Sequence, residues 1–321
     1  MPLEISIPIA YMWLMELNGF HHLTAITADA PANHNFYTQV LGLRMVKKTV
    51  NQDDTSAYHL FYADGLGSAG TDITFFDWPA AREKRGTNSV VRTGLRIQGE
   101  KAIGFWMDRF KALGVAAEKP TEENGRQIIA FEDFEGQRLA LVMDEAQTSA
   151  NVWAKSAVPA EHQIRGLGPI TLSVADNQYT DLILTDAMGM KRGAAFGDTH
   201  VYKMRDQGPV AELHVKVEPN LPRATQGAGA VHHVAFNIAM GDYDAWAQRL
   251  QSLRIPNSGK VDRFWFKSLY FREPSGILFE IATDGPGFQA DEPMDKLGET
   301  LSLPPFLEAK RAAIEAGLKK L

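Results

Sequence analysis

Four of the nine histidines stand in two adjacent pairs, His21–His22 and His232–His233. Each pair opens a segment in which apolar and polar residues alternate as in a β-strand, so the two rings of a pair point to opposite faces of the sheet. One imidazole of each pair therefore faces the concave side of its sheet. Packed histidines with hydrogen-bonded rings are the ordinary alternative, but two pairs at matching repeat positions favour a shared chemical role.

A third candidate group is Glu280, which lies in the apolar strand sequence ILFEIAT. A buried carboxylate is costly unless a cation or a salt bridge compensates its charge. The matching position of an internal repeat is Ala140, so this strand has no structural need for a carboxylate. Two imidazoles and one carboxylate form a facial ligand set, which suits non-haem Fe(II) and related divalent metals and leaves coordination positions open.

Composition narrows the functional classes. The chain has 321 residues, 45% hydrophobic and 22% charged, which predicts a globular protein of two domains or one large one. No cysteine is present, which excludes disulfides, thiolate metal sites and cysteine nucleophiles and fits a reducing, cytoplasmic compartment. A net charge of −6, from 33 basic and 39 acidic residues, provides no electrostatic basis for binding nucleic acid or an anionic membrane.

The first 17 residues are expected to form an N-terminal extension. The run Ile5–Leu17 is apolar, but Glu16 interrupts it and it is shorter than the ~20 residues of a membrane span. No Lys or Arg precedes Arg44, so the basic region of a signal peptide is missing.

The elements that position these side chains repeat as four βαβββ units, at about 19–79, 89–144, 168–218 and 229–283. The sequence HHLTAIT (21–27) aligns with HHVAFNI (232–238), and DFEGQRLAL (133–141) aligns with EPSGILFEI (273–281). In the four units, helices are predicted near Pro31–Leu41, Ile103–Leu113, Tyr179–Ala187 and Tyr243–Leu253.

A unit of this length must pair with a neighbour to bury its apolar face. Chain order predicts one domain at 18–147, from the first two units, and another at 168–290, from the last two. A linker at 148–167 joins them, and a tail at 291–321 carries a helix from Pro305 onward. The predicted fold is α+β, with two curved, mostly antiparallel sheets that each cup a pocket.

Longer motifs occur in a fixed order: GFHHLTAITADAPANHNFYTQVLGLRMVKKTVN (19–51), YHLFYADGLGSAGTDITFF (58–76), GAVHHVAFNI (229–238), SLYFREPSGILFEIATDGPGF (268–288) and LGETLSLPP (297–305). Together they resemble the vicinal-oxygen-chelate (glyoxalase/bleomycin-resistance/dioxygenase) superfamily, and within it the hydroquinone-type ring-cleaving dioxygenases. The resemblance implies a glyoxalase/extradiol dioxygenase-like fold and an Fe(II) cofactor, with Mn(II) as the alternative. It also implies a small aromatic substrate and O2 as partners, and allows a homo-oligomer.

The resemblance carries roles onto particular residues. It implies that His22, His233 and Glu280 hold the metal and that His21 and His232 act beside these ligands. It also implies catalytic pocket roles for Arg263 and Tyr270, although the segment VDRFWFK (261–267) departs most from the family pattern and Arg263 is equally well read as a surface charge. Two further histidines on strands are candidates for an extra acid or base, with core packing favoured for both: His59 and His200.

The function expected is that of a non-haem Fe(II)-dependent, extradiol-type ring-cleaving dioxygenase acting on a hydroquinone or catechol. A glyoxalase-I-like isomerase is the first alternative, but that chemistry uses a fourth protein ligand. The position matching Glu280 in the first unit is Thr74, and only a shifted alignment would restore a ligand at Asp72 or Asp77. A metal-free protein that binds a small molecule such as a drug is the second alternative.

Overall fold

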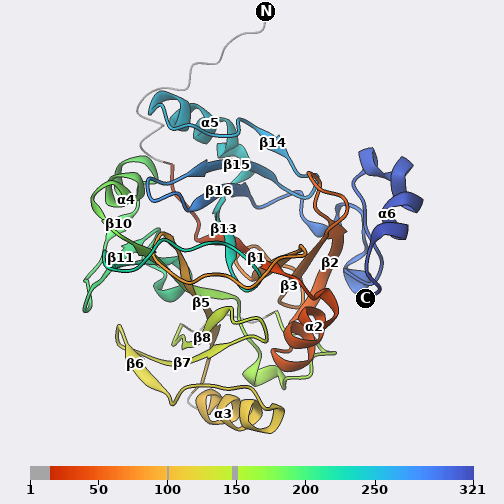
Figure 1. The fold of residues 1–321 in the computed structure, drawn as a ribbon, viewed down its shortest axis with the longest axis horizontal. Helices are drawn as coiled ribbons and strands as arrows, with labels where there is room; N and C mark the ends of the chain where they lie inside the picture. Colours follow the sequence, from red (N-terminus) through yellow and green to blue (C-terminus); the bar gives the residue numbers. More distant parts are fainter. Residues whose placement is uncertain (1–14, 100, 147–150) are drawn as a thin grey trace, which may run out of the picture.

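The computed structural model describes residues 15–99, 101–146 and 151–321, and most of the predicted N-terminal extension therefore lies outside the described residues. The described chain forms two eight-stranded sheets with short helices around them (Figure 1). No helix within these ranges has both the length and the apolar character needed to cross a bilayer.

The four predicted units are present, each with one helical segment and four strands. The first unit comprises β1 (Phe20–Thr27), α2 (Ala30–Asn35) continued by a π-helical turn (Phe36–Val40), β2 (Arg44–Val50), β3 (Tyr58–Ala63) and β4 (Asp72–Asp77). The second comprises β5 (Ser89–Ile97), α3 (Ala102–Leu113), β6 (Thr121–Glu123), β7 (Arg126–Glu132) and β8 (Arg138–Met143).

The third and fourth units repeat this order. The third has β9 (Leu167–Val174), α4 (Gln178–Leu182) with a π-helical turn (Ile183–Ala187), β10 (Lys191–Arg192), β11 (Thr199–Lys203) and β12 (Glu212–Val217). The fourth has β13 (Val231–Ile238), α5 (Tyr243–Ser252), β14 (Val261–Asp262), β15 (Lys267–Arg272) and β16 (Leu278–Thr283). The tail helix begins as a 3-10 helix (Pro305–Lys310) and continues as α6 (Arg311–Gly317).

The units pair differently from the prediction. One sheet has the order β14-β15-β16-β13-β1-β4-β3-β2, so it joins the fourth unit to the first, and the other has the order β10-β11-β12-β9-β5-β8-β7-β6, which joins the third to the second. The predicted pairing of consecutive units within 18–147 and within 168–290 is therefore wrong. The opening strands pair across units: β1 pairs with β13 and β5 pairs with β9. Because the opening strands of the four units are similar, their order along the chain does not determine which of them pair.

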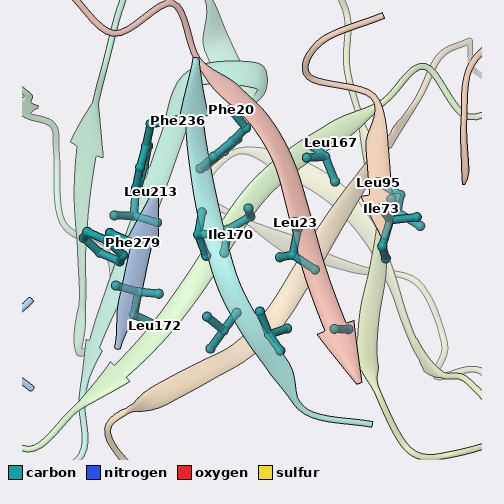
Figure 2. Packing of buried hydrophobic residues seen from close by; sticks show 14 of the residues in the cluster. Phe20, Leu23, Ile73, Leu95, Leu167, Ile170, Leu172, Leu213, Phe236 and Phe279 are labelled. Atoms are coloured by element: carbon teal, nitrogen blue, oxygen red, sulfur yellow. The ribbon is translucent and has the colours of Figure 1, made fainter. Parts of the chain in front are cut away.

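The main core lies between the sheets and is built from both (Figure 2). Leu23 of β1 and Phe236 of β13 meet Leu95 of β5 and Ile170 of β9 in one buried cluster. Because side chains alternate along a strand, the neighbours of these core residues point to the opposite face of each sheet. For β1, that places His22 on the concave face of the first sheet.

Candidate metal centre and aromatic pocket

Three adjacent strands in the middle of the first sheet carry the predicted metal ligands. His22 lies on β1, His233 on β13 and Glu280 on β16, and β13 runs between the other two strands. All three residues are buried. The pairing of the first unit with the fourth is what brings them together, because consecutive pairing would have separated His22 from the other two.

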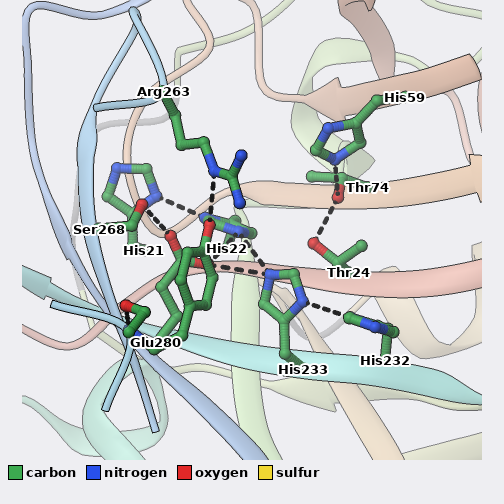
Figure 3. Close-up of polar contacts among 12 residues, drawn as sticks. His21, His22, Thr24, His59, Thr74, His232, His233, Arg263, Ser268 and Glu280 are labelled. Carbon is green, nitrogen blue, oxygen red and sulfur yellow. Dashed lines mark hydrogen bonds and ion pairs between the residues drawn. The ribbon is translucent and has the colours of Figure 1, made fainter. Parts of the chain in front are cut away.

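The three side chains point at one another across a short gap (Figure 3). The Nε2 atoms of His22 and His233 lie 3.2 Å apart, and Glu280 Oε2 lies 3.2 Å from His22 Nε2 and 2.9 Å from His233 Nε2. These are the only three described residues whose potential ligand atoms gather in this way. Burial acts to raise the pKa of Glu280, but the neighbouring imidazoles hold it well below its usual value.

The first histidine of the first pair orients the second. His21 Nε2 lies 3.0 Å from the Thr283 carbonyl oxygen, which only accepts hydrogen bonds, so Nε2 of this ring carries the hydrogen. Burial and the neighbouring His22 lower the pKa of His21 to about 3, so the ring is neutral and its Nδ1 is an acceptor. His22 Nδ1 lies 2.8 Å away and must donate to it. The other ring nitrogen of His22, Nε2, is the one directed at His233 and Glu280.

The second histidine pair has the same contact between its two rings, but its first ring has different surroundings. His232 Nδ1 lies 2.8 Å from His233 Nδ1, as in the first pair. Burial and His233 lower the pKa of His232 to about 3, and burial also lowers the pKa of His233. Within the described chain His232 Nε2 has no carbonyl partner like that of His21, and the ring packs against Phe76 and Trp78.

Strand register identifies the residue that stands where a fourth ligand would be. In the fourth unit, His233 pairs with Leu278 and Glu280 lies two residues further along β16. In the first unit, His22 pairs with Asp72, and the residue two positions further along β4 is Thr74. The predicted match of Thr74 to Glu280 is confirmed. Asp77 instead binds Lys319, with 2.7 Å between Oδ1 and Nζ, and Asp72 is not part of the cluster.

A pocket opens beside His22 and His233 along the concave face of the first sheet. Five of its twelve lining residues are phenylalanine, tryptophan or tyrosine, and the other seven are polar or charged. Its lining residues are His22, Asn51, Gln52, Asp53, His59, Phe61, Phe76, His233, Arg263, Trp265, Phe266 and Tyr270.

The predicted pocket residues Arg263 and Tyr270 both line this cavity. Tyr270 pairs directly with Glu280 in the β15–β16 register, as its spacing suggested. Arg263 Nε donates to the Tyr270 hydroxyl at 3.2 Å, and the guanidinium also binds the Asp53 carboxylate at 3.2 and 2.8 Å. Burial and Glu280 raise the pKa of Tyr270, so its hydroxyl stays protonated at neutral pH. Arg263 is therefore not a free surface charge.

Several contributors escaped the sequence prediction. Ser268 donates to Glu280 Oε1 and so orients the carboxylate, and Gln52 Nε2 donates to the Arg263 carbonyl at 2.9 Å from the opposite end of the chain. Strand alternation was the available signal for Ser268, because it shares the face of Tyr270 on β15. No local signal marks Gln52 or Asp53, which lie in a polar turn.

The prediction that His59 and His200 pack in the core is wrong for both residues. His59 is half-buried and lines the pocket, with Nε2 2.9 Å from the Thr74 hydroxyl. His200 is exposed on β11 of the second sheet, away from the cluster.

Comparison with known proteins agrees with this architecture. The family model of the Glyoxalase/Bleomycin resistance protein/Dioxygenase superfamily matches residues 19–141 and 166–281. The chain belongs to this superfamily. Within it, the chain is 44% identical over 315 residues to the Bacillus subtilis (strain 168) protein named "Putative ring-cleaving dioxygenase MhqA", covering 96% of this chain and all of that one.

Other superfamily members extend the comparison. The "Chlorohydroquinone/hydroquinone 1,2-dioxygenase" of Sphingobium indicum is 28% identical over 300 residues, covering 91% of this chain and 93% of that one. A crystal structure titled as a putative dioxygenase from Bacillus subtilis has a TM-score of 0.89 at 36% identity and covers 96% of this chain and 98% of its own. Maize glyoxalase I shares the fold, with a TM-score of 0.61 at 14% identity, covering 83% of this chain and 92% of its own.

Proposed function

We propose that this protein is a metal-dependent ring-cleaving dioxygenase acting on a dihydroxyaromatic compound, with His22, His233 and Glu280 holding the metal. The observation that supports this proposal most strongly is the cluster of three ligand side chains, with Thr74 standing where a fourth protein ligand would be. In a six-coordinate site three protein ligands leave three positions open, enough for dioxygen beside a substrate that binds through one or two oxygens, whereas a fourth ligand would leave only two. The relatives named as ring-cleaving and hydroquinone dioxygenases support this reading.

The cluster fits a divalent metal. Ligand atoms about 2.1 Å from one ion and at right angles to each other lie about 3.0 Å apart, and the three separations here are 2.9, 3.2 and 3.2 Å. Glu280 Oε2 is buried and has no well-aligned hydrogen bond among the described residues, and the Nε2 atoms of His22 and His233 lie 3.2 and 2.9 Å from it. A carboxylate buried in this way needs a cation to compensate its charge. Nitrogen and oxygen donors suit Fe(II), our preferred cofactor, with Mn(II) as the alternative.

When bound, the metal would supply the redox chemistry that joins dioxygen to an electron-rich ring. The protein's own residues bind and orient that ring. The aromatic walls Phe61, Phe76, Trp265 and Phe266 exclude water and pack against its faces. Arg263 remains cationic because Asp53 and Tyr270 raise its pKa against the effect of burial. Its guanidinium is thus placed to stabilise a phenolate oxygen.

We assign proton transfer to the side chains around the phenolate oxygen of the substrate. Tyr270 lies beside Arg263 and pairs with Glu280, so we assign its protonated hydroxyl the role of proton donor on the β15 wall. His21 and His232 each contact a ligand ring rather than the pocket, so we assign them the task of orienting His22 and His233. Such outer partners fix the tautomer of a ligating histidine.

The test is oxygen uptake by anaerobically Fe(II)-loaded protein given a panel of hydroquinones and catechols. We expect uptake with at least one compound, together with a new near-ultraviolet or visible band from the conjugated ring-opened product. A parallel assay with the hemithioacetal of glutathione and methylglyoxal examines the isomerase. Isomerisation without oxygen uptake, with Ni(II) or Zn(II) preferred, would contradict the dioxygenase. Purified protein that contains and takes up no metal would favour the metal-free binding protein.

A further inference from the structure

His59 stands on the wall of the pocket that faces Arg263 and Tyr270. In the first sheet β3 and β15 are each two strands away from the central β1–β13 pair, on opposite arms. His59 comes from β3 and Tyr270 from β15, and both line the pocket. Figure 3 shows the His59 ring directed into the site from the other side of the ligand cluster.

Local contacts hold the His59 ring in place. Its centroid lies 4.0 Å from that of Phe61 and 4.4 Å from that of Phe76. Nε2 is hydrogen-bonded to Thr74 Oγ1 at 2.9 Å, and Thr74 is bonded to Thr24 Oγ1 at 2.8 Å. Burial, together with His22 and His233, lowers the pKa of His59 well below its usual value, so the ring is neutral. Within the described chain, Nδ1 has no hydrogen-bond partner.

The internal repeat gives His59 a counterpart. Thr74 pairs with Phe61 across β3–β4, and Glu280 pairs with Tyr270 across β15–β16. Two residues earlier on each strand stand His59 and Ser268. Ser268 bonds Glu280, and His59 bonds Thr74, so the same position contacts the same partner in both units. In the first unit that partner, Thr74, is not one of the proposed metal ligands. The residue at the position of Ser268 is His59, whose longer side chain has a second ring nitrogen that can form a further hydrogen bond.

We propose that His59 binds the hydroxyl of the substrate that does not reach the metal, and thereby selects para-dihydroxyaromatics over ortho-diols. This inference rests on the proposed function. A ring whose first oxygen lies between the ligand cluster and Arg263 extends its far edge toward the β3 wall. The only imidazole of the described lining that belongs neither to the cluster nor to its neighbours is His59.

A neutral imidazole suits this task in either tautomer. If Thr74 donates to Nε2, then Nδ1 carries a hydrogen and donates to the substrate oxygen; if Nε2 donates to Thr74, then Nδ1 accepts the substrate hydroxyl. An ortho-diol directs both oxygens to the metal side and leaves Nδ1 unused. A site built to hydrogen-bond a substrate hydroxyl discriminates against an analogue that lacks it, because the polar group of the site is then left unpaired.

The test measures equilibrium binding without oxygen, by calorimetry on metal-loaded protein. The ligands are hydroquinone and 4-methylphenol, which replaces the para-hydroxyl with a methyl group. Wild-type protein should bind hydroquinone about tenfold more tightly, as expected for one hydrogen bond of about 1.4 kcal/mol. His59→Phe keeps an aromatic ring and should lose this preference while binding 4-methylphenol unchanged. His59→Gln should recover part of it, and His200→Gln, on the other sheet, should behave as wild type.

Steady-state kinetics provide a second measurement. With hydroquinone, His59→Phe should raise KM by about tenfold, while its metal content stays that of wild type. A hydroquinone preference that persists in His59→Phe, or is missing from wild type, would overturn the inference. If no compound supports oxygen uptake but the binding preference behaves as described, the dioxygenase proposal fails and the role of His59 in recognition stands.

Discussion

At the scale of single residues, the centre depends on which ring nitrogens carry hydrogen. The paired histidines and the carboxylate in an apolar strand marked the region of the cluster, and the family resemblance singled out His22, His233 and Glu280, the three side chains that gather in the structure. The sequence was not sufficient to predict the Thr283 carbonyl that fixes the tautomer of the first pair, since that contact spans 262 residues. Long-range contacts leave no local pattern.

Removing a ligand should remove the metal. Wild-type protein should contain about one Fe or Mn per chain, whereas His22→Ala and Glu280→Ala should each lose metal and oxygen uptake together, because two remaining ligands hold a divalent ion poorly. Elemental analysis of the purified variants measures this. His200→Ala is the matched histidine control and should retain both properties. Full metal content in either ligand variant would contradict the assignment.

Removing an outer histidine should instead reduce the rate while most of the metal stays. Loss of such a partner typically costs ~10–100-fold in activity or metal affinity. We expect His21→Ala to be more damaging than His232→Ala, because only His21 passes its hydrogen bond on to a backbone carbonyl. Paired measurements of kcat and metal content decide the matter. Equal losses in the two variants would show that the Thr283 contact is unimportant.

At the scale of elements, sequence periodicity located the helices of the four units within a few residues, and the repeat alignment matched Thr74 to Glu280, as the strand register confirms. Which unit pairs with which was not predictable from strand patterns, because all four opening strands are apolar and similar. The ligand residues held the missing information: only pairing of the first unit with the fourth unites His22 with His233 and Glu280.

The register at Thr74 leads to an element-level prediction. Thr74→Glu should place a second carboxylate at the position equivalent to Glu280, giving four protein ligands. The variant should keep or strengthen metal binding but lose oxygen uptake, because one of the open positions would be filled. Thr74→Val, which has a similar volume and no ligand atom, is the control and should keep the metal. Undiminished oxygen uptake by Thr74→Glu would show that its carboxylate does not reach the metal.

At the scale of the whole molecule, the tail packs against β2 at the edge of the first sheet. Lys47 of β2 is fully buried and binds Asp291 and Glu292 from the segment after β16, and its ammonium lies 5.0 Å from the centroid of the Trp265 ring. Trp265 lines the pocket, so this cluster joins the tail to the pocket wall. From the sequence, the tail was predicted only as a charged segment with a helix; its contact with β2 depends on the folded sheet.

Lys47→Met should destabilise the protein strongly. Removing one partner of a buried ion pair leaves uncompensated buried charge and costs about 3–5 kcal/mol. Chemical denaturation of the variant should therefore show a clearly lower midpoint. Lys48→Met, one residue away, loses only a 3.3 Å contact to the Glu299 carbonyl and should change the midpoint little. A change as small as that of the control would argue against the tail being anchored through Lys47.

The second sheet has the same architecture, but within its described residues no His–His–Glu cluster forms. By register, Arg92 occupies the position of His22, while Ala140 and His214 occupy the positions of Thr74 and Glu280. Its arms are joined instead by an ion pair, in which Arg126 of β7 binds Glu212 of β12 at 2.7 and 2.9 Å. The second and third units thus form a scaffold that buries the back of the first sheet.

That ion pair should make stability sensitive to acid. Burial would raise the pKa of Glu212, but the hydrogen bond with His214 and the Arg126 guanidinium lower it to about 2, below the ordinary value of 4.5. Because the folded-state pKa is depressed, the ionised carboxylate contributes its full stabilisation above pH 4.5 and loses it as the pH falls toward 2. Glu212→Gln should therefore be less stable than wild type at pH 7, and the difference should shrink between pH 4.5 and 2. Denaturation midpoints of wild type and Glu212→Gln across this pH range measure the effect, and Glu161→Gln, at an exposed position, is the control. A difference in midpoint that does not change with pH would mean that Glu212 stabilises the second sheet by packing rather than by charge.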